Sequence, residues 1–296
     1  MSAWREGYVA GGDTRFFVRV LGHGPDLALL LHGWPGTGRA WHRVAPILAD
    51  AGYRVACPDL KGFGRSVQRE DRSRSSTRSL EGRSRLLSRP GERRRRPARR
   101  LAGARRGYDS RTLADEITRL IRGLHVRKAV VVGHDWGGAV ALATAFRHPG
   151  RVRALVLANS PYRELDLRRA WAIPLLNLPI LPEVAFRLES ERLVRLALRY
   201  AAVRTDVFPP DVVAEYADAV RADPGGWLAY YRTLSRRALV ERGVGAATKA
   251  LPGLARRNAA HRLRVPASVL WGAEDPVLPI ALGRSAADEL GARFVP

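Results

Sequence analysis

Short apolar runs alternate along the chain with longer stretches of helical spacing. Runs rich in leucine and β-branched residues predict strands at 8–10, 15–20, 27–31, 53–57, 129–132, 154–158 and 267–271. Apolar positions three and four apart predict helices over 112–124, 137–147 and 41–51, and in the last of these Val44, Ile47 and Leu48 would share the buried face. This alternation indicates an α/β fold: a mostly parallel sheet flanked by helices, after an antiparallel N-terminal start.

Two stretches interrupt the alternation. Residues 161–258 have helical spacing and no strand pattern, and their prolines divide them into several short helices. We therefore expect a core over 1–160, an inserted helical cap over 161–258, and the core continued over 259–296. Residues 67–106 are an Arg/Ser/Gly tract, which we expect to be a disordered insertion within the core.

Of the formal charge of +23, a net +11 lies in that tract of forty residues, which holds fifteen arginines and four acidic residues. The tract contains no aromatic residue to stack on bases and no nucleic-acid-binding motif, so it does not predict a nucleic-acid partner. The chain has no apolar run of roughly 18 residues or more, and its N-terminus lacks an apolar signal core, so we expect neither a membrane span nor secretion. A single cysteine, Cys57, excludes an intrachain disulfide and suits a cytoplasmic location.

The strongest chemical signal lies between Val130 and Leu142. An apolar run ends in a turn of small residues, an alanine-rich helix pattern follows, and Asp135 stands at the apex. This order is typical of a nucleophile elbow, where small neighbours let strand and helix approach closely. An aspartate at that place would attack carbon through a carboxylate oxygen and form an ester on the protein. The simpler alternative is a helix N-cap aspartate.

Four separated segments resemble the α/β-hydrolase fold family with an aspartate nucleophile: His32–Gly36, Asp59–Ser66, Gly133–Gly138 and Trp271–Pro276. The resemblance covers about 1–66 and 107–296, and it implies an α/β-hydrolase core with an inserted cap. It also implies that Asp135 is the nucleophile.

The resemblance assigns roles to several further residues. The backbone N–H groups of Trp34 and Trp136 would form the oxyanion hole. The Trp136 indole would either contact the substrate at its leaving group or be only a core aromatic. Asp275 would orient a catalytic histidine, with Glu274 as a neighbouring candidate; alternatively, Asp275 caps the helix that starts near Pro279. We expect Asp59 and the glycines that follow it to form the architecture of a turn.

The resemblance further implies a histidine beyond the last strand, which would activate water. None of the histidines at 23, 32, 42, 125, 134, 148 and 261 follows Asp275, and the side chain of His134 is expected to point away from the site. We therefore expect a chain that is incomplete at its C-terminus and is alkylated without efficient turnover. A shifted reading frame is the favoured origin of the tract over 67–106.

Three reaction classes share the aspartate elbow: epoxide hydrolases, haloalkane dehalogenases and fluoroacetate dehalogenases. Trp34–Pro35 after His-Gly resembles the epoxide hydrolases. The segment Gly226–Arg232 resembles their cap segment, with Tyr231 as the proton donor and Tyr230 as the fallback and a substrate contact. Ala172–Ile173 replaces the His-Trp pair of the fluoroacetate dehalogenases.

Epoxide hydrolysis is therefore the expected activity, with haloalkane dehalogenation and a catalytically dead binding scaffold as the alternatives. A second cap tyrosine is not placed: Tyr162 and Tyr200 match no motif, and Phe186 occupies the expected neighbourhood. No metal or organic cofactor is implied. The expected partners are a small epoxide or haloalkane and water, and the oligomeric state is not predicted.

Overall fold

The computed structural model describes residues 3–68, 105–162, 169–204, 206–234 and 263–296. They form one nine-stranded sheet in the order β1-β2-β4-β3-β6-β7-β8-β9, with β5 paired to β2. The strands are β1 (Arg5–Ala10), β2 (Thr14–Leu21), β3 (Leu27–Leu31), β4 (Arg54–Pro58), β5 (Val67–Gln68), β6 (Ala129–His134), β7 (Val152–Ala158), β8 (Ala267–Leu270) and β9 (Arg293–Val295). Strand β2 pairs antiparallel with β1 and with β4. Each neighbouring pair in the rest of the sheet, in the order β4-β3-β6-β7-β8-β9, is parallel. The predicted α/β class and sheet are thus confirmed.

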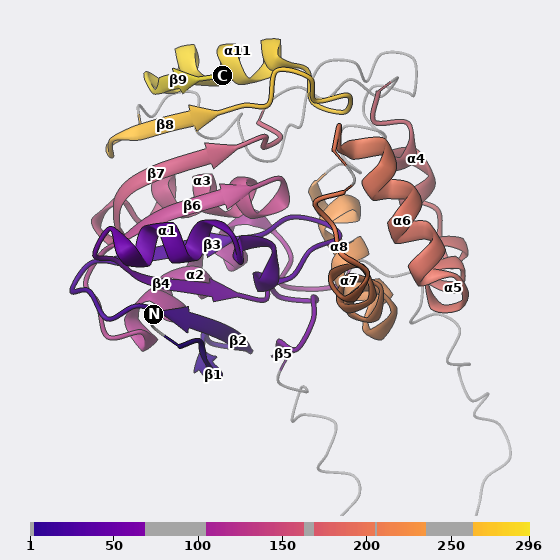
Figure 1. The fold of residues 1–296 in the computed structure, drawn as a ribbon, viewed down its shortest axis with the longest axis horizontal. Coiled ribbons are helices and arrows are strands. Elements are labelled where there is room, and N and C mark those ends of the chain that lie inside the picture. The colour runs from indigo at the N-terminus through magenta and orange to yellow at the C-terminus, as the bar shows by residue number, and fades with distance from the viewer. Residues whose placement is uncertain (1–2, 69–104, 163–168, 205, 235–262) are drawn as a thin grey trace, which may run out of the picture.

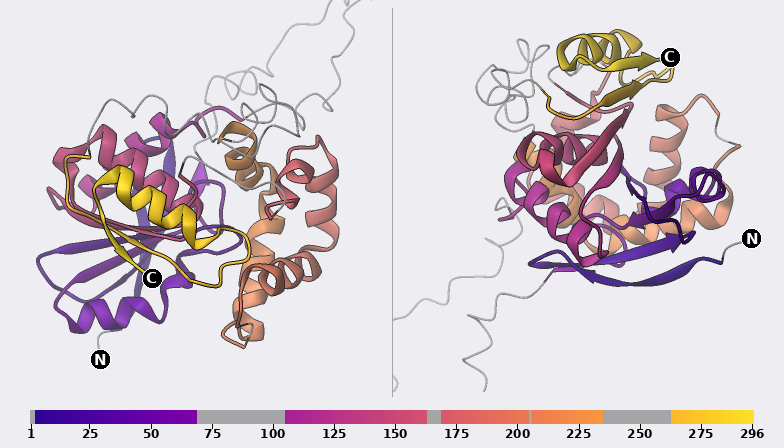
Figure 2. Two further views of the ribbon diagram at one scale, coloured as in Figure 1. Left: turned by 90° about the horizontal axis from the view of Figure 1, so that it is seen from above. Right: turned by 90° about the vertical axis from the view of Figure 1, so that its left-hand side faces the viewer.

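Helices cover both faces of the sheet (Figures 1 and 2). The core helices are α1 (Val44–Asp50), α2 (Ser110–Gly123), α3 (Trp136–Arg147) and α11 (Ile280–Leu290), with short 3₁₀ turns at Gly38–Trp41 and Pro149–Arg151. Helices α2 and α3 pack in the main apolar cluster, whereas α1 packs in a smaller cluster on the opposite face. Asp109 starts α2 by accepting a hydrogen bond from the Thr112 N–H at 3.0 Å.

The predicted buried face of α1 is wrong. Ile47 is 68% exposed and Val44 39%, while Ala45 is fully buried and Leu48 is partly buried. Helix α1 contacts β4, and a small Ala45 side chain lets the two backbones come close, so the bulkier residues turn outward. The spacing identified the helix but not the side on which it packs.

Helices α4–α8 follow β7 in sequence and lie together beyond the carboxyl ends of the parallel strands (Figure 1). They are α4 (Ala172–Leu176), α5 (Leu181–Leu188), α6 (Ser190–Ala201), α7 (Pro210–Ala222) and α8 (Pro224–Leu234). The rest of the predicted cap, over 235–258, lies outside the described residues. This arrangement places a helical layer over the edge of the sheet where Asp135 emerges.

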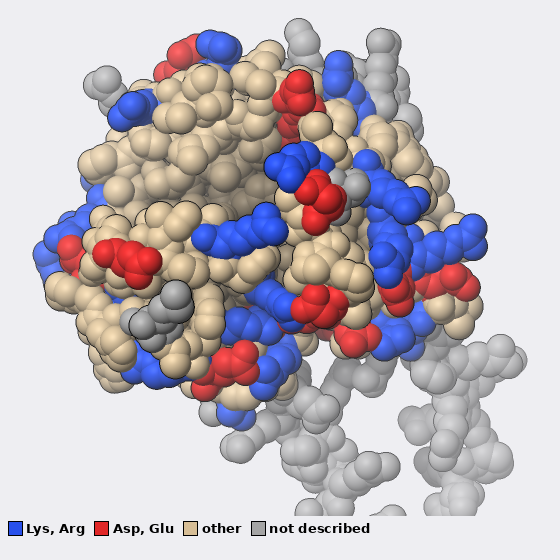
Figure 3. Space-filling view, viewed as in Figure 1, with Lys and Arg blue, Asp and Glu red and all other residues tan. Residues whose placement is uncertain are grey.

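The arginine-rich tract lies outside the described residues over 69–104. At its described ends, Val67 and Gln68 form β5 against β2, and Arg105 pairs with Asp223 of the cap at 2.7 Å. On the face shown in Figure 3, basic and acidic side chains are intermixed over the cap helices, and no single-sign patch dominates that view. None of the described helices combines the length and apolar character that a bilayer-spanning segment requires.

Candidate active site

Asp135 occupies a strained turn between β6 and α3. Its backbone has φ 50° and ψ −124°, a region that residues other than glycine rarely adopt. The turn is tight, because a Cβ on Gly137 would clash with the carbonyl oxygen of Leu31. Asp135 makes no side-chain cap hydrogen bond, and an N-cap residue normally has extended backbone. The geometry is therefore that of an elbow, which lifts the carboxylate above the sheet edge.

Two backbone N–H groups converge on the Asp135 carboxylate. The Trp34 N–H donates to Oδ2 at 2.9 Å, and the Trp136 N–H also donates to the carboxylate. Gly33 permits this approach, since a Cβ there would lie 2.6 Å from Oδ2. These are the two N–H groups expected from the sequence, and the structure brings them to one carboxylate.

The surroundings of Asp135 favour its neutral form. Burial raises the pKa of this carboxyl to about 7, and the negative charge of Asp275 acts in the same direction, while the N–H groups of Trp34 and Trp136 oppose the rise. Since only the carboxylate anion is a competent nucleophile, the reactivity of this group changes within the neutral pH range.

Asp275 lies in the loop after β8, and both of its carboxylate oxygens have partners. Oδ1 accepts from the N–H groups of Val277 and Leu278 at 2.9 and 2.8 Å, and Oδ2 accepts from Nδ2 of Asn159 at 2.5 Å. Helix α11 starts later, with Pro279 at its N-cap, so Asp275 stabilises the loop rather than capping that helix.

Sequence reasoning missed Asn159. It directly follows β7, has φ 38°, and also accepts a hydrogen bond from the Gly272 N–H at 3.1 Å. The sequence could have indicated Asn159, because it is a polar residue at the carboxyl end of the strand that follows the elbow strand. The carboxyl ends of parallel strands meet at one edge of a sheet.

A cavity of about 590 Å³ separates the sheet edge from the cap. The core contributes Trp34, Asp135, Trp136 and Asp275, and α8 of the cap contributes Tyr231. Burial raises the pKa of the Tyr231 phenol well above its ordinary value, and the Asp135 charge adds to the rise. Tyr231 therefore stays protonated and faces the same space as the nucleophile candidate.

The other tyrosines are placed differently from the expectations. Tyr230 does not line the cavity; it is fully buried against Phe63 and Tyr108, so the structure supports neither its fallback role nor a substrate contact. Tyr200 lines the cavity, but its hydroxyl donates to the Arg169 carbonyl at 2.6 Å. Tyr216 of α7, which no sequence motif singled out, also lines the cavity.

The expected orientation of His134 is wrong. This residue lines the main cavity and also an adjoining one of about 520 Å³, which it shares with Asn159, Glu274 and Asp275. Strand β6 ends at His134, so the following turn leaves its ring beside the sheet edge. Glu274 lines only the adjoining cavity. Within the described residues, no histidine hydrogen-bonds Asp135 or Asp275.

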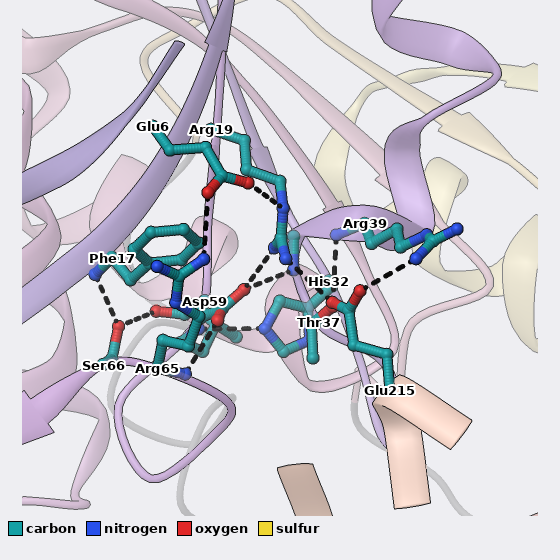
Figure 4. Close-up of polar contacts among 12 residues, drawn as sticks. Glu6, Phe17, Arg19, His32, Thr37, Arg39, Asp59, Arg65, Ser66 and Glu215 are labelled. Carbon is teal, nitrogen blue, oxygen red and sulfur yellow. Dashed lines mark hydrogen bonds and ion pairs between the residues drawn. The ribbon is translucent and has the colours of Figure 1, made fainter. Parts of the chain in front are cut away.

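A polar network beneath the cavity supports the turn that carries Trp34 (Figure 4). The Asp59 carboxylate accepts hydrogen bonds from the N–H groups of Gly38 and Arg65 at 2.8 and 2.9 Å and pairs with Arg19 at 3.0 Å. His32 Nε2 accepts from the Leu60 N–H at 2.9 Å, and burial lowers the pKa of this imidazole to about 4. Asp59 thus has the turn role expected from the sequence.

Glu215 of α7 connects this network to the cap (Figure 4). Its carboxylate accepts from Thr37 Oγ1 at 2.6 Å and pairs with Arg19 at 2.9 Å and with Arg39 at 3.2 Å. Thr37 and Arg39 belong to the loop that follows the Trp34 turn, so helix α7 is fixed to the segment whose Trp34 N–H donates to Asp135.

In the described ranges, no group of three or more His, Cys, Asp or Glu side chains is arranged to hold a metal ion. Cys57 is buried in β4 with a free thiol.

Comparisons with known proteins agree with this fold. The family model described as alpha/beta hydrolase fold matches residues 28–294. The AB hydrolase superfamily protein YfhM of Bacillus subtilis is 27% identical over 274 residues, which are 87% of this chain and 77% of that protein. Epoxide hydrolase 3 of Xenopus tropicalis is 29% identical over 193 residues, 62% of this chain and 41% of that protein. The crystal structure of Cfl2 from Burkholderia cenocepacia superposes with a TM-score of 0.69 at 22% identity, covering 99% of this chain and 87% of that one.

Proposed function

Because this chain belongs to the alpha/beta hydrolase fold family, we propose that it acts on an epoxide, with Asp135 as the nucleophile. The observation that carries the proposal is the aspartate itself: it stands at the apex of a strained elbow, with two N–H donors on its carboxylate. A hydroxyl at that apex would attack an acyl carbon, whereas a carboxylate attacks a saturated carbon. The epoxide-hydrolase name of the Xenopus relative agrees, although the match spans less than half of that protein.

In the first step, one Asp135 oxygen attacks a carbon of the oxirane ring. A new C–O ester bond forms, the ring C–O bond breaks, and its electron pair leaves as an alkoxide. The Tyr231 phenol faces the same cavity and supplies the proton to that alkoxide; the resulting phenolate regains a proton from water. The product is a hydroxyalkyl ester of Asp135.

Hydrolysis of that ester then places negative charge on the former carboxylate oxygen. The N–H groups of Trp34 and Trp136 already point at this carboxylate, and they would stabilise the charge. Attack by water needs a base that Asp275 would orient, and within the described residues no histidine hydrogen-bonds Asp275. We therefore expect the ester to accumulate in the chain as given.

A haloalkane is the second candidate substrate. Its displacement by Asp135 needs no proton, but the departing halide needs N–H donors, and the Trp136 indole lines the same cavity. The protonated Tyr231 phenol favours the epoxide, because an alkoxide must be protonated and a halide need not be.

Intact-mass spectrometry of the protein incubated with 1,2-epoxyhexane or 1-bromohexane tests the proposal. The epoxide should add its whole mass, whereas the bromide should add a hexyl group in place of a proton, and peptide mapping should place either ester on Asp135. Asp135→Asn should abolish the adduct, and Asp288→Asn, an exposed change on α11, should not. Absence of an adduct with both reagents, or equal labelling of Asp135→Asn, would refute the assignment.

A further inference from the structure

The cavity is built for an uncharged and mostly apolar molecule. One face of α6 lines it through residues spaced three or four apart, Leu193, Ala197, Tyr200 and Ala201. At 1.5 Å per residue this wall is about 12 Å long. The charged or titratable lining groups are His134, Asp135, Asp275 and Arg169, besides the tyrosines. The cap side is therefore suited to a hydrocarbon portion several carbons long.

Tyr216 of α7 adds a polar group to the cap side of this mostly apolar cavity. The residue is 4% exposed and lines the cavity, and its hydroxyl makes no hydrogen bond with the described residues around it. The hydroxyl oxygen is not among the buried polar atoms that lack a partner, so it is open to the cavity and can bind water when no ligand is present. A bound molecule that displaces this water keeps the hydrogen bond only if it places a polar atom beside the Tyr216 hydroxyl.

The position of Tyr216 is fixed by its neighbours on α7. Val212, Val213 and Val220 are buried on the same helix, and Glu215 binds the core loop through Thr37. The ring lies beside the turn after Trp34, since a Cβ on Gly36 would be 3.7 Å from Tyr216 Cζ.

The hydroxyl groups of the two other tyrosines in the cavity already have a partner or a proposed role. The Tyr200 hydroxyl donates to a backbone carbonyl, and Tyr231 is assigned to the opening oxirane. Tyr216 therefore has no task in the reaction as proposed, yet it presents a donor to the bound molecule.

We propose that Tyr216 determines specificity by donating a hydrogen bond to an oxygen of the substrate other than the oxirane oxygen. The preferred substrate is then an uncharged, mostly hydrocarbon epoxide that carries one ether, carbonyl or hydroxyl oxygen away from the reacting ring. This inference rests on the proposed function for the epoxide, but the second oxygen is argued from the cavity alone.

Binding of unreactive ligands tests the second oxygen without any chemistry. A series of ten-atom 1,2-diols, in which one methylene at a time is replaced by an ether oxygen, is titrated against the protein. Binding is followed by the fluorescence of Trp34, Trp136 and Trp171, which line the cavity. The wild type should bind at least one ether isomer about 2- to 10-fold more tightly than the all-carbon diol, the range expected for one neutral hydrogen bond. Tyr216→Phe should remove that preference.

Tyr200→Phe is the matched control, because it deletes a cavity hydroxyl that already has a backbone partner, and it should keep the ether preference. Tyr216→Phe should also leave the melting temperature nearly unchanged, since the hydroxyl that it removes makes no hydrogen bond with the described residues. Equal binding of all diols by the wild type, an ether preference that survives in Tyr216→Phe, or a clear loss of stability in that variant would overturn the proposal. Alkylation by the corresponding epoxides is measured separately, so failure of the Asp135 assignment is distinguishable from failure of the Tyr216 assignment.

Discussion

The rate at which an epoxide alkylates Asp135 should rise about tenfold between pH 6 and pH 8. With a pKa of about 7, the carboxyl is roughly 9% ionised at pH 6 and roughly 91% ionised at pH 8. An aspartate with an ordinary pKa would be almost fully ionised throughout this range, so its rate would be flat. Tyr231 does not limit this window, because its pKa lies well above the ordinary value.

The assay is the initial rate of adduct formation by intact-mass spectrometry from pH 5.5 to 8.5 at constant ionic strength. Asp135→Asn gives the background reaction at other residues. Asp275→Asn removes a negative charge that raises the Asp135 pKa, so the midpoint should move toward acid. A flat profile, a midpoint near 4, or a midpoint that moves toward alkali in Asp275→Asn would refute the account of the electrostatics.

The same shift predicts a pH-dependent stability without any substrate. The folded state holds the Asp135 proton up to about pH 7, whereas the unfolded chain releases it near pH 4, so this group destabilises the fold as pH rises through that window. Each pKa unit corresponds to about 1.4 kcal/mol, and the cavity admits some water, so a loss on the order of 2–4 kcal/mol is expected above pH 7. Asp135→Asn should remove that loss in urea unfolding at pH 8 and have little effect at pH 4.

Three further changes test other contacts. Tyr231→Phe should slow alkylation by an epoxide about 100-fold, but not by a bromoalkane, because only the alkoxide needs a proton; equal slowing of both reagents would contradict its role as a donor. Glu215→Ala should lower the free energy of unfolding by about 1–3 kcal/mol, since the Thr37 hydroxyl loses its acceptor and Arg19 and Arg39 each lose one of their carboxylate partners. Asp218→Ala, which breaks an exposed pair on the same helix, should cost about 0–1 kcal/mol. Arg232→Met should lower the free energy of unfolding by about 3–5 kcal/mol, because it leaves the buried Glu183 carboxylate without its ion-pair partner. The double variant Arg232→Met with Glu183→Gln should recover most of that loss in denaturant unfolding.

The elements that the sequence pattern predicted well are those whose signal is local. The prediction of the strand before Asp135 and of the turn with its glycines depends only on residues close in sequence. The four segments that resemble the α/β-hydrolase family each follow a strand, and this identified the sheet edge that holds the site. The contacts between separate elements were not accessible in this way. The packing side of α1 depends on which face β4 leaves free, so Ile47 was assigned to the wrong side.

The same limit explains the residues of the site that were missed or misplaced. Asn159 matters because β7 and β8 are neighbours in the sheet, and Tyr216 matters because α7 crosses the cavity beside the Trp34 turn. For Tyr216 the contact itself is its place in the cavity lining beside Gly36, and neither this contact nor the pairing of β7 with β8 follows from spacing along the chain. The side chain of His134, which adjoins Asp135, was expected to point away from the site, but the strand ends at that residue, where alternation of side chains no longer holds.

The Glu215 contacts make the cap and the oxyanion turn parts of one thermodynamic system. A ligand that binds under the cap and orders α7 also biases the loop of Thr37 and Arg39, and hence the turn that holds the Trp34 N–H against Asp135. By reciprocity, any change that strengthens the hydrogen bond from this N–H to the Asp135 carboxylate must raise the affinity for the ligand under the cap by the same factor. We therefore expect affinity at a distant part of the cavity to be coupled to stabilisation of the reacting carboxylate, with Glu215 and Asp211 of α7 linking the two through the core loop.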